Sequence, residues 1–193
     1  IPNGLAHGVR QASDFLMALQ LTGAAKSESL ANLTVRLPIA VIGGGLTAID
    51  TATEALAYYP VQVEKFLSRY ETLAAEDPAA GFDFSADEAG IAEEFIRHAK
   101  ALREERAAAA REGRAPRIAA LLESWGGATV VYRRRLTESP SYTLNHEEIE
   151  KAMEEGIAFA EGLSPSAVEV DQHGHATALL VTAQGQDKDA KPL

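Results

Sequence analysis

The chain has 193 residues, 46% hydrophobic and 24% charged, which suits one globular domain with its own core, or one domain with an insertion. Its net charge of −10 argues against nucleic-acid binding through phosphate neutralisation. The absence of cysteine excludes disulfides and a thiolate-ligated iron–sulfur cluster in this chain. No apolar run is long enough to span a bilayer and Ile1 opens no signal-peptide pattern, so we expect no membrane contact and a cytoplasmic location.

Up to residue 60, hydrophobic periodicity predicts a helix, a polar connector, a buried strand and a second helix, over residues 14–21, 24–33, 35–42 and 46–58. Ser13 is expected to cap the first helix, and Gly23 to follow its end. Pro38 is expected to delay or kink the strand. Pro60 is expected to close the second helix, because proline lacks the backbone donor that a helix interior uses.

Between residues 60 and 125 the pattern becomes helical, and we expect a helical insertion in an α/β domain. Ser85 and Glu88 have the spacing of a capping box, which predicts that a helix begins there. His98 is expected on a charged, solvated face of that helix. Trp125 is expected to be a packing residue that anchors the return from the insertion.

After residue 126 the α/β pattern returns. It predicts two short strands, a helix between them and a final β-hairpin, over residues 128–132, 157–160, 147–155 and 167–182. Asn145 is expected to cap the helix, and the tail from residue 184 to fray. The whole pattern predicts an α/β fold. We expect a Rossmann-like, three-layer nucleotide-binding domain with a central parallel sheet and a small β-hairpin or meander, built from residues 1–59 and 126–193 around the insertion 60–125.

The strand Ile39–Ile42 runs directly into three glycines. Gly43, Gly45 and Ala48 fit the form G-x-G-x-x-G/A between a strand and a helix, which is the context in which this pattern binds dinucleotides. Gly43 permits a sharp turn, Gly45 has no Cβ in the way of a pyrophosphate, and Ala48 lets the helix pack closely on the strand. The first N–H groups of the helix and its positive dipole end then face the phosphates. The alternative is a plain glycine-rich turn in another kind of α/β protein.

Two segments compete for the second strand, whose end reads the adenosine ribose in such folds. Val61–Val63 ends at Glu64, nineteen residues after the last glycine (64 − 45), where a carboxylate would favour NAD. Ala128–Tyr132 ends at Arg133 and Arg134, which would favour NADP if the helices between are an insertion. We favour the second segment, because no turn residue separates the first from the helical pattern after it. Pairing of the arginines with surface carboxylates is the alternative.

Several stretches resemble the NADPH-binding domain of the glutamate synthase small (beta) subunit and its relatives, which belong to the two-dinucleotide flavoprotein class, the pyridine nucleotide-disulfide oxidoreductase family. They are GGGLTAIDTA (43–52), VVYRR (130–134), EEIEKAMEEGIAF (147–159) and the opening segments IPNGLAHGV (1–9) and ASDFL (12–16). The matches cover most of residues 1–58 and 126–182. The tyrosine–arginine–arginine strand end and the Glu-Glu-Gly-Ile helix end are the most specific.

The resemblance implies a flavin-dependent oxidoreductase in which this domain holds NADPH against FAD on a neighbouring domain of the same full-length protein. Hydride would pass to FAD, and electrons would leave towards an electron-accepting subunit or an iron–sulfur protein. Carried over by motif, the residues that would cradle the pyrophosphate are Gly43, Gly44, Gly45, Leu46 and Thr47. Arg133 and Arg134 would take the 2′-phosphate, and Asp50 would support the loop from the first helix. No residue of this chain is expected to be catalytic, because the flavin performs the chemistry.

The chain departs from the family in several places. The family usually has Asp or Asn where Leu46 stands, and often has Met-Pro-Ala near Pro140, where this chain reads Ser-Pro-Ser-Tyr. The helical segment 60–125 lies outside the common pattern, and no FAD-type glycine loop is present, so we do not expect activity from this chain alone. Two alternatives stay open. One is a freestanding NAD-dependent dehydrogenase with Glu64 as ribose ligand, and the other a non-catalytic Rossmann module that docks a partner through the insertion.

Overall fold

The computed structural model describes residues 1–77, 81–183 and 191–192, so most of the tail expected to fray lies outside the described residues. The elements in chain order are α1 (Ala12–Thr22), β1 (Ile39–Ile42), α2 (Leu46–Glu76), α3 (Ala86–Glu112), α4 (Ile118–Ser124), β2 (Ala128–Tyr132), the 3₁₀ turn η1 (Leu136–Glu138), α5 (Pro140–Glu154), β3 (Ile157–Glu161), β4 (Leu163–Val170), β5 (Ala176–Ala183) and β6 (Lys191–Pro192). Within these residues, no helix is both long and apolar enough to cross a membrane.

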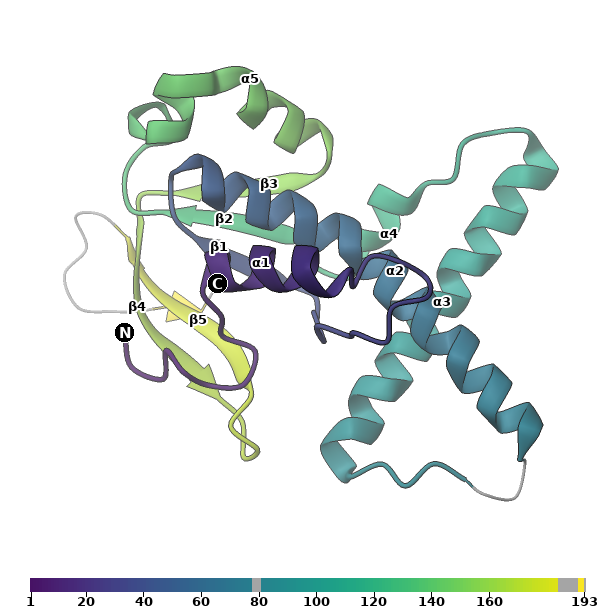
Figure 1. Ribbon diagram of the computed structural model, residues 1–193. Helices are drawn as coiled ribbons and strands as arrows, with labels where there is room; N and C mark the ends of the chain where they lie inside the picture. Colours follow the sequence, from purple (N-terminus) through teal and green to yellow (C-terminus); the bar gives the residue numbers. More distant parts are fainter. Residues whose placement is uncertain (78–80, 184–190, 193) are drawn as a thin grey trace.

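A three-stranded parallel sheet forms the centre of the fold, in the order β1-β2-β3 (Figure 1). Val41 lies beside Val130, and Val130 beside Phe159. Helices connect the consecutive strands, as parallel pairing requires. The expected α/β fold class with a parallel sheet is therefore confirmed. The first strand is shorter than the pattern 35–42 predicted, since pairing begins only after Pro38.

The two faces of the parallel sheet are covered by different structures (Figure 1). Val41, Val130 and Ile157 face the main core, where they meet α2 and α5. Val131 points to the opposite face, because side chains alternate along a strand, and it packs against Val168 of the β4–β5 hairpin. The predicted hairpin is confirmed, and it covers the face that the helices leave open.

Helix α2 continues to Glu76, so the prediction that Pro60 closes it is wrong. Pro60 is buried inside the helix and supplies no N–H to the preceding turn. The helix continues because Tyr59, Val63 and Leu67 are all buried in the same core as the parallel sheet. Burial of three such side chains contributes several kcal/mol, on the order of 1.5–3 kcal/mol each, which exceeds the roughly 3 kcal/mol penalty of an internal proline.

His98 is buried, not solvated as the charged helix pattern suggested. Its ring stacks on Trp125 with centroids 3.9 Å apart, and its Nδ1 lies 2.6 Å from the Tyr59 hydroxyl. Trp125 thus anchors the return of the chain to β2, as predicted. The capping box of Ser85 and Glu88 at the start of α3 is also confirmed. Sequence periodicity placed His98 on the polar side because it could not reveal that α4 ends against that side.

Two helix starts differ from the predictions. Gln11, not Ser13, is the N-cap of α1, although Gly23 ends this helix in the left-handed conformation as expected. Helix α5 begins at Pro140, with Ser139 as its N-cap. Asn145, the expected cap, has non-helical backbone angles inside α5 and marks a kink there.

Candidate functional site

The glycine loop 43–45 joins the end of β1 to the start of α2. The Gly43 N–H donates to the carbonyl of Val131 at 3.1 Å, so the loop leaves the sheet only after a last contact with β2. A Cβ on Gly43 would lie only 3.0 Å from the Cβ of Ala48, closer than side chains normally approach. Because glycine has no Cβ, the helix can pack this closely on the strand. No described residue lies within 4 Å of a Cβ built on Gly45, so the backbone there faces space that this part of the chain leaves open.

The first turn of α2 presents free backbone donors beside this open space. Gly45 is the N-cap, and no side chain of the described residues caps the helix. The Ala48 and Ile49 N–H groups bond to the Gly45 carbonyl at 3.0 and 3.4 Å. The N–H groups of Leu46 and Thr47 have no acceptor within a helix, by their position in the first turn. The first turn also has no acidic side chain, so its positive dipole end is not neutralised locally.

The end of β2 lies against the glycine loop. Its last residue, Tyr132, is half-buried, and its ring occupies the place that a Cβ on Gly44 would take. Arg133 and Arg134 follow with exposed side chains. Across the described ranges 1–77 and 81–183, neither guanidinium group makes an ion pair. The alternative in which these arginines pair with surface carboxylates therefore has no support among the described residues.

The loop and the two arginines lie at the same edge of the sheet, because β1 and β2 are adjacent and parallel, with Ile42 beside Val131. Neighbouring strands are about 4.8 Å apart, so the residues that follow them start close together. The structure thus brings together seven of the residues that the sequence singled out: Gly43, Gly44, Gly45, Leu46, Thr47, Arg133 and Arg134. Asp50 lies one turn further along α2 with an exposed side chain.

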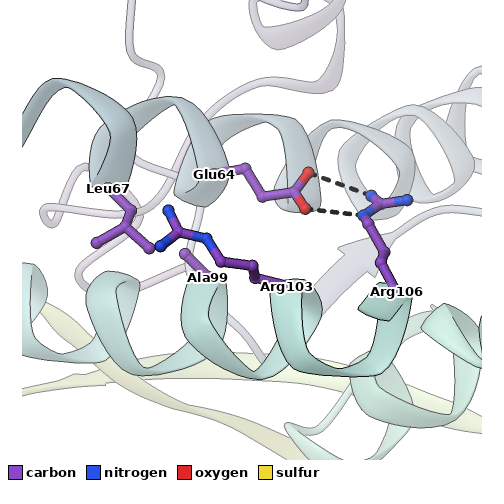
Figure 2. Close-up of a pocket in the computed structure, with 5 residues that line it drawn as sticks. All are labelled: Glu64, Leu67, Ala99, Arg103 and Arg106. Atoms are coloured by element: carbon purple, nitrogen blue, oxygen red, sulfur yellow. Dashed lines mark hydrogen bonds and ion pairs between the residues drawn. The ribbon is translucent and has the colours of Figure 1, made fainter. Parts of the chain in front are cut away.

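Glu64 lies elsewhere, on the part of α2 that crosses α3 (Figure 2). Its carboxylate bonds to the Arg106 guanidinium, with N···O distances of 2.9 and 3.1 Å. The hollow beside this pair is also lined by Leu67, Ala99 and Arg103, and Arg103 is itself paired with Glu71. Glu64 is eighteen residues beyond Leu46, or about 27 Å along the helix. A carboxylate at that distance cannot contact a ribose whose pyrophosphate rests on the glycine loop.

Two serines at the start of α5 also contact the loop, and sequence reasoning missed them. The Ser141 N–H and hydroxyl both donate to the Gly44 carbonyl, at 3.1 and 3.0 Å. Ser139 accepts the Tyr142 N–H at 3.1 Å and caps the helix. For Ser139 the signal was present, since serine followed by proline is typical of a helix start. What the sequence does not show is that this start lies on the glycine loop.

No family model matches the chain. The chain is 42% identical over 175 residues, 91% of its length, to the uncharacterized protein RP006 of Rickettsia prowazekii (strain Madrid E). It spans only 22% of the length of that relative, so the matched region is a small part of a longer protein there.

Proposed function

We propose that this chain is a Rossmann-like NADPH-binding domain of a flavin-dependent oxidoreductase, similar to the glutamate synthase small subunit. One observation carries the proposal. Two adjacent parallel strands end together. One leads into a bare backbone with free helix N–H groups, and the other into two exposed arginines that form no ion pair with any described residue. A ligand that carries a pyrophosphate and a second phosphate on the adenosine ribose matches both halves of this arrangement.

Each half would recognise a different group of NADPH. The N–H groups at the start of α2 would bind the pyrophosphate, where the helix dipole favours negative charge. Arg133 and Arg134 would bind the 2′-phosphate, since guanidinium groups form paired hydrogen bonds to phosphate oxygens. NADH lacks that phosphate and would leave the arginines without a partner. We therefore expect a preference for NADPH.

The role of the chain would be to bind and orient the coenzyme. The nicotinamide would face FAD on another domain of a longer protein, and hydride transfer to the flavin needs no acid or base from residues described here. Electrons would then pass to an accepting subunit or an iron–sulfur protein. The position of Glu64 on the α2–α3 contact gives the NAD-dependent alternative no support.

Calorimetric titration of the 193-residue chain with NADPH and NADH tests the proposal. We expect NADPH to bind at least about tenfold more tightly, because a charge-assisted hydrogen bond contributes about 1.5–3 kcal/mol. The double variant Arg133→Ala with Arg134→Ala should lose this preference. Arg103→Ala with Arg106→Ala is the matched control, since it removes the same charge from α3. Equal affinity for both nucleotides, or an unchanged double variant, would contradict the assignment.

A further inference from the structure

The carbonyl of Gly44 is held by a directional chain of hydrogen bonds. Ser141 has one hydroxyl proton, and it donates this proton to the Gly44 oxygen at 3.0 Å. The Ser139 and Ser141 hydroxyl oxygens are 3.1 Å apart, so Ser139 must be the donor in that contact. Ser139 in turn accepts the Tyr142 N–H. The Ser139 and Ser141 hydroxyl groups therefore each have a fixed orientation.

These hydrogen-bonded serines lie in the interior of the protein and not on a solvated surface. Ser139 is 0% exposed and Ser141 1% exposed, although the loop that they contact faces open space at Gly45. The Ser141 N–H adds a second bond to the same carbonyl, at 3.1 Å. Tyr132 covers the α-carbon of Gly44, so this residue is held by hydrogen bonds and by a ring. Buried polar groups with all partners satisfied make a rigid unit.

The held carbonyl determines the direction of the next amide. The peptide between Gly44 and Gly45 is trans, because the one cis bond in the described residues is Leu37–Pro38. In a planar trans peptide the C=O and N–H groups point in opposite directions. With the Gly44 oxygen directed at Ser141, the Gly45 N–H is directed away from α5. Gly45 is the N-cap of α2, so this N–H directly precedes the N–H groups of the first turn of the helix.

We propose that Ser141 is a positioning residue for the pyrophosphate of the bound nucleotide. It acts through the Gly44 carbonyl, fixing the Gly44–Gly45 peptide so that the Gly45 N–H is directed away from α5 before any ligand arrives. Preorganised donors bind better than donors that must first be ordered. This inference rests on the proposed function, because it assigns the role of one residue within the same site.

Affinities for two ligands test the inference. NADPH contains the pyrophosphate, whereas adenosine 2′-monophosphate contains only the part expected at Arg133 and Arg134. We expect Ser141→Ala to weaken NADPH binding about three- to tenfold, as loss of one hydrogen bond implies, and to leave adenosine 2′-monophosphate affinity unchanged. Ser141→Cys fills nearly the same space with a weaker donor, and it should shift NADPH affinity in the same direction by less. Ser166→Ala, which removes a hydroxyl bonded to Leu180 in the β4–β5 hairpin, should change neither affinity.

The outcomes separate the inference from the proposed function. If the unsubstituted chain binds neither ligand, the proposed function and this inference both fall. If it binds both, but Ser141→Ala weakens them equally or not at all, only the role of Ser141 is wrong. Hydrogen exchange without ligand gives a second readout, in which the amides of residues 44–47 should exchange faster in Ser141→Ala than in Ser166→Ala. Equal exchange in the two variants would overturn the inference.

Discussion

Tyr59 and His98 share a hydrogen bond of 2.6 Å between α2 and α3, inside the main core. Trp125 directly follows α4, and its indole stacks on the His98 imidazole with the rings 7° from parallel. Burial is the largest effect on the pKa of His98 and lowers it, Glu94 raises it and Arg97 lowers it further. The neutral imidazole is therefore the form that this packing favours.

The first prediction concerns the stability of the fold at mildly acidic pH. In the unfolded chain His98 takes up a proton near its ordinary pKa of about 6.5. In the folded protein His98 takes up this proton only at a lower pH. Between the folded and the unfolded pKa, the unfolded state therefore binds more protons than the folded state. The stabilisation is thus fully present above pH of about 6.5, and the free energy of unfolding falls as the pH decreases from there towards the folded pKa.

Urea unfolding at pH 7.5 and pH 5.5 measures this effect. We expect His98→Gln to reduce the difference in unfolding free energy between the two pH values, because glutamine does not titrate. His146→Gln, at an exposed histidine of α5, is the matched control and should keep the difference. An equal pH dependence in all three proteins would show that His98 does not titrate differently on folding.

The second prediction concerns Lys65, whose ammonium group fixes the connector between α1 and β1. Its Nζ donates to the carbonyls of Ala24 and Ala31, at 2.7 and 3.0 Å. Lys65→Met keeps most of the aliphatic stem but removes these bonds. The free energy of unfolding should fall by about 1.5–3 kcal/mol, the usual effect of a hydrogen bond to a charged donor. Lys100→Met, at an exposed position of α3, should change it by less than about 0.5 kcal/mol. Similar values for both variants in denaturant unfolding would refute the assignment.

How much of the site and the fold could be predicted depends on how far apart the interacting residues are along the sequence. The glycine loop and the arginines each follow a short strand, and each can be recognised within about ten residues. Their meeting at one edge followed from the parallel sheet. Ser141 and His98 could not be recognised, because their partners Gly44 and Tyr59 are 97 and 39 residues away. The same holds for Pro60, since its helix is stabilised by contacts with α3 and the sheet, and not by local propensity.

The last prediction separates two neighbouring glycines. A Cβ on Gly44 would overlap the Tyr132 ring, with 2.6 Å to its Cδ2 atom, whereas a Cβ on Gly45 would meet nothing. We expect Gly44→Ala to lower the free energy of unfolding by about 1–3 kcal/mol, as overpacking does, and to cost less in a Tyr132→Ala background. Gly45→Ala should lower the free energy of unfolding by no more than about 1 kcal/mol, because alanine is a poorer N-cap than glycine but its methyl group overlaps no described residue.

The effect on nucleotide binding should be the reverse of the effect on stability. Relative to the stability that each variant loses, Gly45→Ala should weaken NADPH binding more than Gly44→Ala does. On the proposed function, the new methyl group at Gly45 occupies the space of the pyrophosphate, so Gly45→Ala should weaken NADPH binding strongly while the fold stays intact. Thermal unfolding with and without NADPH reads both quantities in one experiment, since a ligand that binds only the folded state raises the midpoint. A Gly45→Ala variant that NADPH stabilises as well as the unsubstituted chain would place the phosphates somewhere other than this loop.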